Sequence, residues 1–310
     1  MMSKWTNKNI PDLTGKIAIV TGANSGLGFY TTLELAKHHC TVVMACRDKF
    51  KAQIAQEKIL RLVPNAQIMI ELVDLASLDS FRLFAENFQT RFSKLSLLVN
   101  NAGVMDIPYQ KTQDNFERQF ATNYLGAFAL TGRLFSSLQA EPHARVVMVS
   151  SFYHRIGKID FDNLQGEKKY NAKLAYSNSK LADVMFAIEL NRRLQLANSS
   201  LISVAAHPGY SDTHLQFVGP NIEKKWLKKL WFKVGNALIA QSAAKGAWPL
   251  LYAACAPNVK GGEFYGPDGL WGLRGNPQKI QGAKKAYDEK IAKKLWEVSI
   301  ELTGVNFLGI

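Results

Sequence analysis

Two side chains suited to proton transfer lie four residues apart in the segment YSNSK, namely Tyr176 and Lys180. Residues i and i+4 of a helix share one face, so the two side chains would be neighbours. A nearby ammonium favours tyrosinate, and we therefore expect Lys180 to lower the tyrosine pKa from about 10 towards neutrality. Such a tyrosine can be the general acid or base for a carbonyl/alcohol pair. The alternative interpretation is an exposed amphipathic helix, in which this spacing is common.

A second candidate site is the segment TGANSGLG, which lies between an apolar run and a helical pattern. Its glycines have the spacing Gly-x-x-x-Gly-x-Gly. A helix N-terminus offers unpaired N–H groups and a partial positive charge, and glycines let a pyrophosphate approach them. We expect phosphate contacts here, and the alternative is an ordinary glycine-rich strand-to-helix turn. The residues expected to bind are Gly22, Asn24, Ser25, Gly26, Leu27 and Gly28.

The predicted elements that must position these residues are strands and helices that alternate along the sequence. Short apolar runs without strict alternation indicate strands buried on both faces, and the helical patterns between them indicate parallel crossovers. We expect a single α/β, doubly wound domain with a mostly parallel seven-stranded sheet and helices on both faces. One helix is expected over 115–138, and ligands should bind beyond the carboxyl ends of the strands. The expected strands are 16–23, 41–47, 66–75, 95–103, 145–151, 201–209 and 261–266.

Composition narrows the function classes only slightly. The chain has 310 residues, is 47% apolar and 20% charged, and has a formal net charge of +13. The basic excess fits a solvated surface, nucleic acid, a membrane surface or an anionic cofactor, but no nucleic-acid-binding module is recognisable, so we expect no nucleic-acid partner. The three cysteines lack metal-ligand spacing, so we expect no metal and a reducing compartment. The N-terminus lacks the apolar core of a signal peptide, which favours a cytoplasmic protein.

Six motifs in order resemble the classical short-chain dehydrogenase/reductase family, over about 15–269. They are the glycine turn, NNAG at Asn100–Gly103, Asn123 in ATNYLG, Ser151 after the fifth strand, YSNSK, and HPG at His207–Gly209 with Thr213 beyond it. The segment IDFDNLQGEKKY at 159–170 and the tail GGEFYGPDGLWGLRG resemble the retinol-dehydrogenase-like branch. The resemblance implies a Rossmann-type NAD(P)-binding domain over 1–310 and hydride transfer between a nicotinamide and a carbonyl or alcohol.

The resemblance also implies a role for each matching residue. Tyr176, Lys180, Ser151 and Asn123 would be catalytic, with Ser151 rather than Ser150 facing the substrate oxygen. Lys180 and Tyr176 would also contact the cofactor, Lys180 at the nicotinamide ribose, and Asn123 would support a proton-relay water. The other implied cofactor contacts are Asp74 and Leu75 at the adenine, then Asn101, Ala102, Gly103, Pro208, Gly209 and Thr213. A helix N-cap is the alternative for Asp74.

The residues after the second strand favour NADP(H) over NAD(H). An acid at that position binds ribose hydroxyls, whereas an Arg accommodates a 2′-phosphate. Cys46 occupies the acid position here and Arg47 follows it. Ser25 stands where many NADP-binding relatives carry a second basic residue, and Asp48 adjoins Arg47. An NAD-dependent dehydrogenase and a non-catalytic NADP(H)-binding sensor or scaffold therefore remain alternatives.

The substrate is expected to be a lipophilic carbonyl or alcohol, covered by a lid over about 214–240. Within 222–238, apolar residues recur at helical spacing opposite a lysine-rich face. This pattern fits an apolar lid, a peripheral membrane contact, a packed helix with a solvated face, or a subunit contact in a homo-oligomer. A C-terminal extension follows over about 270–310. We interpret His207, at a strand end with no second ligand nearby, as a hydrogen-bonded structural histidine.

Overall fold

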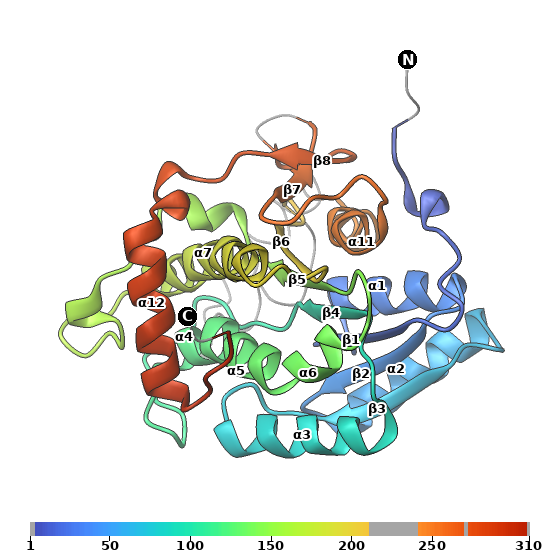
Figure 1. Ribbon diagram of the computed structural model, residues 1–310, viewed down its shortest axis with the longest axis horizontal. Coiled ribbons are helices and arrows are strands. Elements are labelled where there is room, and N and C mark those ends of the chain that lie inside the picture. The colour runs from blue at the N-terminus through green and yellow to red at the C-terminus, as the bar shows by residue number, and fades with distance from the viewer. Residues whose placement is uncertain (1–3, 211–240, 270–271, 309–310) are drawn as a thin grey trace, which may run out of the picture.

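The computed structural model describes residues 4–210, 241–269 and 272–308, and an eight-stranded sheet forms its centre (Figure 1). The strand order is β3-β2-β1-β4-β5-β6-β7-β8; the first seven strands pair in parallel, and β8 is antiparallel to β7. The strands are β1 (Ile17–Thr21), β2 (Thr41–Cys46), β3 (Ile68–Leu72), β4 (Leu97–Asn100), β5 (Arg145–Val149), β6 (Ile202–Ala206), β7 (Phe264–Pro267) and β8 (Pro277–Ile280).

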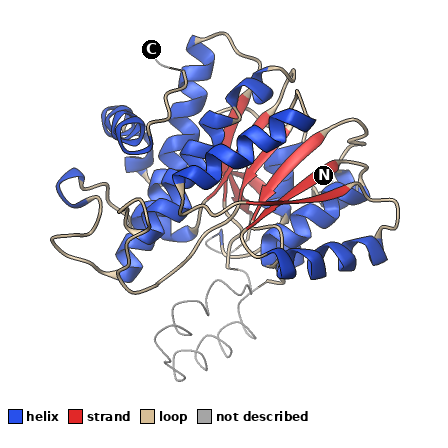
Figure 2. Ribbon diagram, turned by 90° about the horizontal axis from the view of Figure 1, so that it is seen from below, coloured by secondary structure: helices blue, strands red, loops and turns tan. Residues whose placement is uncertain are grey.

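Helices cover both faces of this sheet (Figure 2), as the sequence predicts for a doubly wound α/β domain. Successive residues of a strand point to opposite faces. In β1, Ile19 joins the core with α3, α5, α7 and α12, whereas Ala18 and Val20 join the core with α1, α2 and α11. The helices are α1 (Gly26–Lys37), α2 (Lys49–Leu62), α3 (Leu78–Arg91), α4 (Arg118–Phe120), α5 (Gly126–Arg133), α6 (Phe135–Gln139), α7 (Ala172–Leu196), α10 (Ala243–Gly246), α11 (Trp248–Cys255) and α12 (Glu289–Thr303).

The predicted count of seven strands is wrong by one, because β8 adds an antiparallel edge. Its ladder pairs Phe264 of β7 with Ile280 and continues to Pro267 and Pro277. The two middle residues of β8, Gln278 and Lys279, are exposed. A four-residue polar edge strand has no apolar run in the sequence, and its pairing with β7 is what forms it.

The expected single helix over 115–138 is divided into several pieces. Asn115 has a left-handed φ of +64°, and helical structure begins only with α4. A π-helical turn over Ala121–Leu125 separates α4 from α5, and Leu134, with φ −92° and ψ 4°, separates α5 from α6. π-Helical turns are rare and occur frequently at functional sites.

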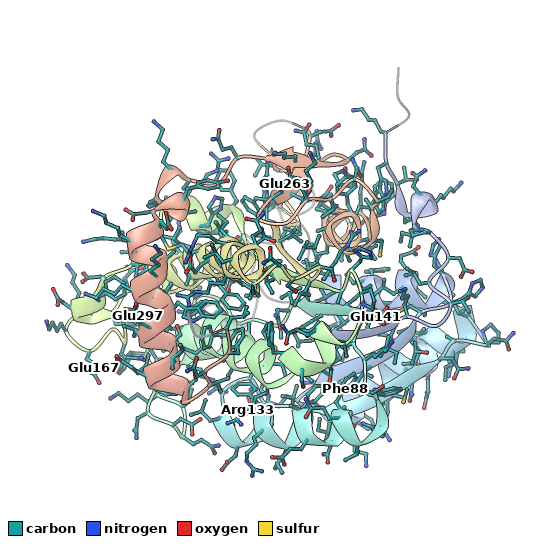
Figure 3. The ribbon with its side chains drawn as sticks, viewed as in Figure 1. Phe88, Arg133, Glu141, Glu167, Glu263 and Glu297 are labelled. Carbon is teal, nitrogen blue, oxygen red and sulfur yellow. The ribbon has the colours of Figure 1, made fainter. Side chains whose placement is uncertain are left out.

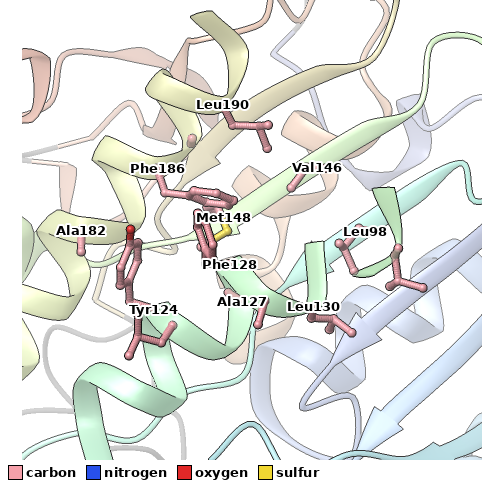
Figure 4. Close-up of a cluster of buried hydrophobic side chains, with 14 of the residues drawn as sticks. Leu98, Tyr124, Ala127, Phe128, Leu130, Val146, Met148, Ala182, Phe186 and Leu190 are labelled. Atoms are coloured by element: carbon pink, nitrogen blue, oxygen red, sulfur yellow. The ribbon is translucent and has the colours of Figure 1, made fainter. Parts of the chain in front are cut away.

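The C-terminal segment packs α12 across the outer face of α7. Trp296 of α12 stacks on Phe186 of α7, with ring centroids 5.7 Å apart and planes 21° apart. Phe186 in turn contacts Phe128 of α5 in the buried cluster of Figure 4. The buried positions of α12 face α7, while charged residues such as Glu297 are exposed (Figure 3). Residues 272–308, the described part of the expected extension over 270–310, therefore complete the core on this side of the sheet.

Several predicted features lie outside the described residues. They are Thr213, the lid over 214–240 and the amphipathic segment 222–238. Among the residues that the structure describes, no helix has the length and apolar character needed to span a membrane.

Candidate active site

The glycine turn brings the N-terminus of α1 against the end of β1. Gly22 has a left-handed φ of +67°. A Cβ on Gly28 would lie 2.3 Å from the Gly22 carbonyl oxygen, so no side chain fits there. The first N–H groups of α1 therefore lie at the carboxyl edge of the sheet, and an α-helix leaves such groups without intrahelical partners. The other predicted residues of this turn are Asn24, Ser25, Gly26 and Leu27, and Ser25 is exposed without a side-chain capping bond.

The turn is tied to the segment after β4. The Thr21 hydroxyl accepts the backbone N–H groups of Asn101 and Ala102, each at 2.9 Å. The Asn101 side-chain amide donates to the Thr21 carbonyl at 2.8 Å. Thr21 is fully buried, and the sequence analysis placed it in the TGANSGLG segment without assigning it a role. A hydroxyl at the end of an otherwise apolar strand was the available signal.

Arg47 projects from the end of β2 and is exposed, with no hydrogen bond or ion pair to any residue the structure describes. The adjacent Asp48 is engaged elsewhere. Its carboxylate caps α2 by accepting the Lys51 N–H at 3.0 Å, and it pairs with the Lys51 ammonium at 3.2 Å. Cys46 is buried, which raises the pKa of its thiol to about 11. The guanidinium at this edge is therefore available to an anion.

Asp74 is not a helix N-cap, so that alternative is wrong. The cap of α3 is Ser77, whose side chain accepts the Ser80 N–H. Asp74 closes a tight turn one step earlier, because its carboxylate accepts the Ala76 N–H at 3.0 Å. Leu75 beside it is buried.

Asn123 lies in the π-helical turn, with its amide fully engaged. Its Oδ1 accepts the Val104 N–H at 2.8 Å, and its Nδ2 donates to the Val104 carbonyl at 3.0 Å and to the Ser179 hydroxyl at 2.9 Å. A Cβ on Gly103 would lie 3.0 Å from Asn123 Oδ1 and 3.8 Å from Lys180 Nζ. Asn123 therefore joins the loop after β4 to α7 and has no free side-chain donor for a water.

Ser150 and Ser151 face different partners. The Ser150 hydroxyl is buried and donates to the Lys180 carbonyl at 2.7 Å, within the packing of α7. The Ser151 hydroxyl accepts the Tyr153 N–H at 3.3 Å and lies near the Tyr176 phenol, whose pKa it lowers. The structure therefore brings Ser151, and not Ser150, to the tyrosine.

Lys180 lies beneath this pair and is nearly buried. Its ammonium is 5.9 Å from the centre of the Tyr176 ring and donates to the Val149 carbonyl at 2.9 Å. It also donates to Asp183 Oδ2 at 2.8 Å, forming an ion pair whose side chains are 5% and 1% exposed. Sequence reasoning missed Asp183. Its spacing of three residues from Lys180 was a signal, but such i,i+3 pairs are usually found on exposed helix faces.

The expected lowering of the tyrosine pKa is wrong in direction. Burial of Tyr176 raises the pKa of its phenol above the usual value, and this outweighs the lowering by the Lys180 ammonium and the Ser151 hydroxyl. Burial alone would lower the pKa of Lys180, but the Asp183 carboxylate raises it overall. The apo site therefore holds a neutral phenol above a charged ammonium, and the sequence could not show this because burial is a tertiary property.

His207 shapes the turn after β6, and its structural interpretation is confirmed. Its Nδ1 accepts the Gly209 N–H at 3.0 Å, and burial lowers the pKa of the imidazole to about 3. Gly209 has φ +70°, and a Cβ there would lie 2.3 Å from the Leu273 carbonyl oxygen. The Pro208 carbonyl accepts the Gln241 side-chain amide at 2.6 Å. This turn is thus held from both sides at the carboxyl edge of the sheet.

His154 links the serine to the C-terminal segment. Its Nε2 accepts the Ala283 N–H at 3.1 Å, so its Nδ1 carries the proton and donates to the Ser151 carbonyl at 2.7 Å. Burial lowers the pKa of this imidazole to about 4, which keeps it neutral. Tyr153 next to it contacts the Tyr176 ring edge-on, with centroids 5.8 Å apart.

Comparisons with known proteins agree with this geometry. A family model described as short chain dehydrogenase matches residues 16–218. Retinol dehydrogenase 11 from Mus musculus is 38% identical over 98% of this chain and 92% of its own length. Retinol dehydrogenase 12 from the same organism is 36% identical over 97% of this chain and 90% of its own length. A crystal structure of an uncharacterized protein from Mycobacterium paratuberculosis matches with a TM-score of 0.81 and 37% identity, covering 98% of this chain and 99% of that one.

Proposed function

This chain belongs to the short chain dehydrogenase family and is an NAD(P)-dependent oxidoreductase, and we propose that it transfers hydride between NADP(H) and a lipophilic carbonyl or alcohol. The observation that carries the proposal is the convergence of Ser151, Tyr176 and Lys180 at the carboxyl edge of the sheet, where the serine and the lysine both act on the pKa of the tyrosine. Each of the three supplies a separate requirement of the reaction.

We assign the proton to the Tyr176 phenol. When the nicotinamide supplies hydride to the carbonyl carbon, the carbonyl oxygen becomes an alcohol oxygen and must gain one proton. Tyr176 gives that proton in reduction and takes it back in oxidation. The Ser151 hydroxyl donates a hydrogen bond to the same oxygen as charge develops on it. Lys180 orients the ribose and stabilises charge on the phenol, and Asn123 holds the loop after β4 against α7.

The decisive variant is Tyr176→Phe, which removes one oxygen and keeps the ring. We expect turnover to fall by about 10²–10⁴-fold, the usual contribution of a positioned acid or base, with cofactor affinity retained. Tyr252→Phe on α11 is the matched control, because its hydroxyl accepts a hydrogen bond from the Asn258 side chain, remote from the three site residues. Undiminished turnover in Tyr176→Phe would refute the assigned role. Cofactor binding by the wild type without turnover on any carbonyl or alcohol would instead favour the sensor or scaffold.

The preference for NADP(H) rests on Arg47, which has no ion pair with any described residue. The glycine turn leads into the N-terminus of α1, where a pyrophosphate is commonly bound, and a guanidinium at the end of β2 suits the 2′-phosphate. A hydrogen bond to a charged group contributes about 1.5–3 kcal/mol, so Arg47→Gln should raise KM for NADPH about 10–100-fold. KM for NADH should stay nearly constant, and Lys51→Gln, which removes a cation already paired with Asp48, should change neither. Equal losses with both cofactors would favour the NAD-dependent alternative.

The other residues that we propose for the dinucleotide line the same edge. They are the glycine turn with Asn24, Ser25 and Leu27, then Asp74 and Leu75, the segment Asn101–Gly103, and the turn at Pro208 and Gly209 with Thr213 beyond it. Thr21 would act through the loops that it joins rather than by direct contact.

The retinol dehydrogenases among the relatives support a retinoid-like or other lipophilic aldehyde or ketone. We further propose that the segment 214–240 forms the lid over this substrate within a single NAD(P)-binding domain. Parallel assays of retinaldehyde, steroid ketones and aromatic aldehydes with NADPH and NADH test the substrate class. Uniformly better turnover of small hydrophilic aldehydes would contradict it.

A peripheral membrane contact through 222–238 and self-association remain proposals from the sequence alone. Salt-dependent sedimentation of the full chain with anionic vesicles tests the first, since attraction of a lysine-rich face to anionic lipid weakens with salt. Light scattering across concentration tests the second. Absence of sedimentation would contradict the membrane contact. A single monomeric mass at all concentrations would contradict self-association.

A further inference from the structure

The α7 carboxylate of Asp183 lies where no part of the proposed reaction requires one. It is buried, it follows Lys180 by three residues on the same helix, and its Oδ2 accepts the lysine ammonium at 2.8 Å. Its Oδ1 is buried and has no hydrogen-bond partner among the residues that the structure describes. Burying an ion pair costs free energy unless the remaining lone pairs are satisfied, so stability alone does not account for this carboxylate.

The surroundings show which groups feel its charge. Asp183 lies among buried apolar residues of α7, where little solvent screens a charge. Its charge acts on Lys180 and Tyr176 of α7 and on Tyr124 of the π-helical turn, and Tyr153 from the turn after Ser151 packs on the Tyr176 ring. Among the described residues in contact with these groups, Asp183 is the one carboxylate and Lys180 is the cation paired with it, while a second cation, Lys173, lies 5.4 Å from the centre of the Tyr153 ring.

From this arrangement we propose that Asp183 is a positioning residue that keeps both Lys180 and Tyr176 protonated at neutral pH and so prepares the site for carbonyl reduction. A negative charge close to two acids opposes the loss of a proton from each of them. The ammonium stays charged and fixed between Asp183 and the Val149 carbonyl, and the phenol stays a proton donor. Reduction consumes a proton from the phenol, whereas oxidation requires tyrosinate. This inference rests on the proposed function and adds its preferred direction.

The raised pKa of the Tyr176 phenol and the raised pKa of the Lys180 ammonium agree with this arrangement. For Lys180 the Asp183 carboxylate overcomes the opposing effect of burial. For Tyr176 it adds to burial, and together they exceed the effect of the ammonium. Removing the negative charge must therefore lower the pKa of both acids, whichever of them limits activity at high pH.

The test is the pH dependence of carbonyl reduction in Asp183→Asn, which keeps the side-chain shape and removes the charge. We expect the alkaline limb of the kcat/KM profile to move about one pH unit lower, the smallest displacement usual for loss of a neighbouring charge. Glu189→Gln is the matched control, because it neutralises another buried carboxylate of α7 that pairs with Arg193. Its alkaline limb should stay in place even if its stability falls.

A second measurement does not require turnover. Alkaline difference absorbance of the apo protein, compared with the same protein carrying Tyr176→Phe, isolates the ionisation of this one phenol. The wild-type midpoint should lie above that of free tyrosine, about 10, and the Asp183→Asn midpoint should lie below the wild-type one. Circular dichroism at each pH limits the titration to the folded range, and Asp183→Ser replaces Asp183→Asn if the latter does not fold.

Two outcomes would overturn the inference: an unmoved alkaline limb in folded Asp183→Asn, or a wild-type Tyr176 midpoint below that of free tyrosine. An equal displacement in Glu189→Gln would overturn it as well, since the effect would then be general. None of these results bears on whether Tyr176 is the proton donor. That question is settled by Tyr176→Phe turnover, so failure of this inference and failure of the proposed function are distinguishable.

Discussion

Two buried carboxylates of α7 each lie beside a cation, but their hydrogen bonds are completed differently. At the middle of the helix, Asp183 shares one oxygen with Lys180 and leaves the other without a described partner. Near its end, Glu189 uses both oxygens, accepting Arg192 twice and Arg193 once, each at 2.7 Å. Arg193 also donates to the Leu308 carbonyl and lies 4.5 Å from the centre of the Trp296 ring.

The difference separates a group held for chemistry from one held for structure. A fully satisfied buried ion pair fixes the packing of two elements, here α7 and α12. A buried carboxylate with one oxygen that accepts no hydrogen bond acts more strongly on neighbouring ionisable groups, because no further donor offsets its negative charge. The active-site position, Asp183, therefore keeps an incompletely hydrogen-bonded carboxylate, whereas Glu189 has no such requirement.

The largest expected effect comes from Lys180→Met, which leaves Asp183 buried without its cation. Breaking a buried pair in this way costs about 3–5 kcal/mol of the free energy of unfolding, and turnover should also be lost. The double variant Lys180→Met with Asp183→Leu should recover most of the stability without recovering turnover. Urea unfolding and NADPH oxidation measure the two quantities separately, and recovery of turnover in the double variant would contradict the division of roles.

A smaller loss of the free energy of unfolding is expected from Glu189→Leu, nearer the C-terminal end of α7. Arg193 keeps its contacts with Leu308 and Trp296, and Arg192 is part-exposed, so the cost should be about 2–3 kcal/mol. The kcat of the folded variant should match the wild type when assayed well below its midpoint temperature. A large fall in kcat would mean that Glu189 also acts on the active site.

The smallest effect per group is expected in mild acid, and it comes from two histidines beside the active site. His154 and His207 have folded-state pKa values lowered to about 4 and about 3 by burial, so only the unfolded chain gains their protons near pH 5. Stability must then fall as the pH drops below about 6.5, by about 2 kcal/mol per imidazole at pH 5. Urea unfolding at pH 7 and pH 5 measures this loss. His207→Gln should reduce the pH-dependent loss by about half, and an unchanged loss would show that His207 is not its source.

The sequence predicted the parts of the fold that depend on local pattern. Buried runs such as 41–47 and 145–151 gave β2 and β5, because a continuous apolar strand needs no partner to be recognised. It did not predict β8, whose exposed Gln278 and Lys279 become a strand only by pairing with β7. It did not predict the π-helical turn either, which coincides with the bonds from the Asn123 side chain to the Val104 backbone.

For the site, motif order predicted which residues would lie together, while their electrostatics escaped prediction. Tyr176, Lys180 and Ser151 meet as expected. Asp183 was overlooked because the letters SKLADVMF do not show which helix face is buried. The direction of the Tyr176 pKa was wrong for the same reason, since the burial of Tyr176 depends on segments distant in the sequence, such as the turn after Ser151.

The bond from His154 to Ala283 has a consequence for the order in which the protein is made. Ser151 is held through His154 by a residue that leaves the ribosome more than a hundred residues later. Tyr124 in the π-helical turn likewise forms its hydroxyl hydrogen bond with Ser299 of α12, and Phe186 stacks on Trp296, so both contacts need residues that are synthesised late. Chains fold from the N-terminus as they are synthesised. The nascent protein can therefore complete its nucleotide-binding strands early, but its reactive centre matures only after release of the last helix.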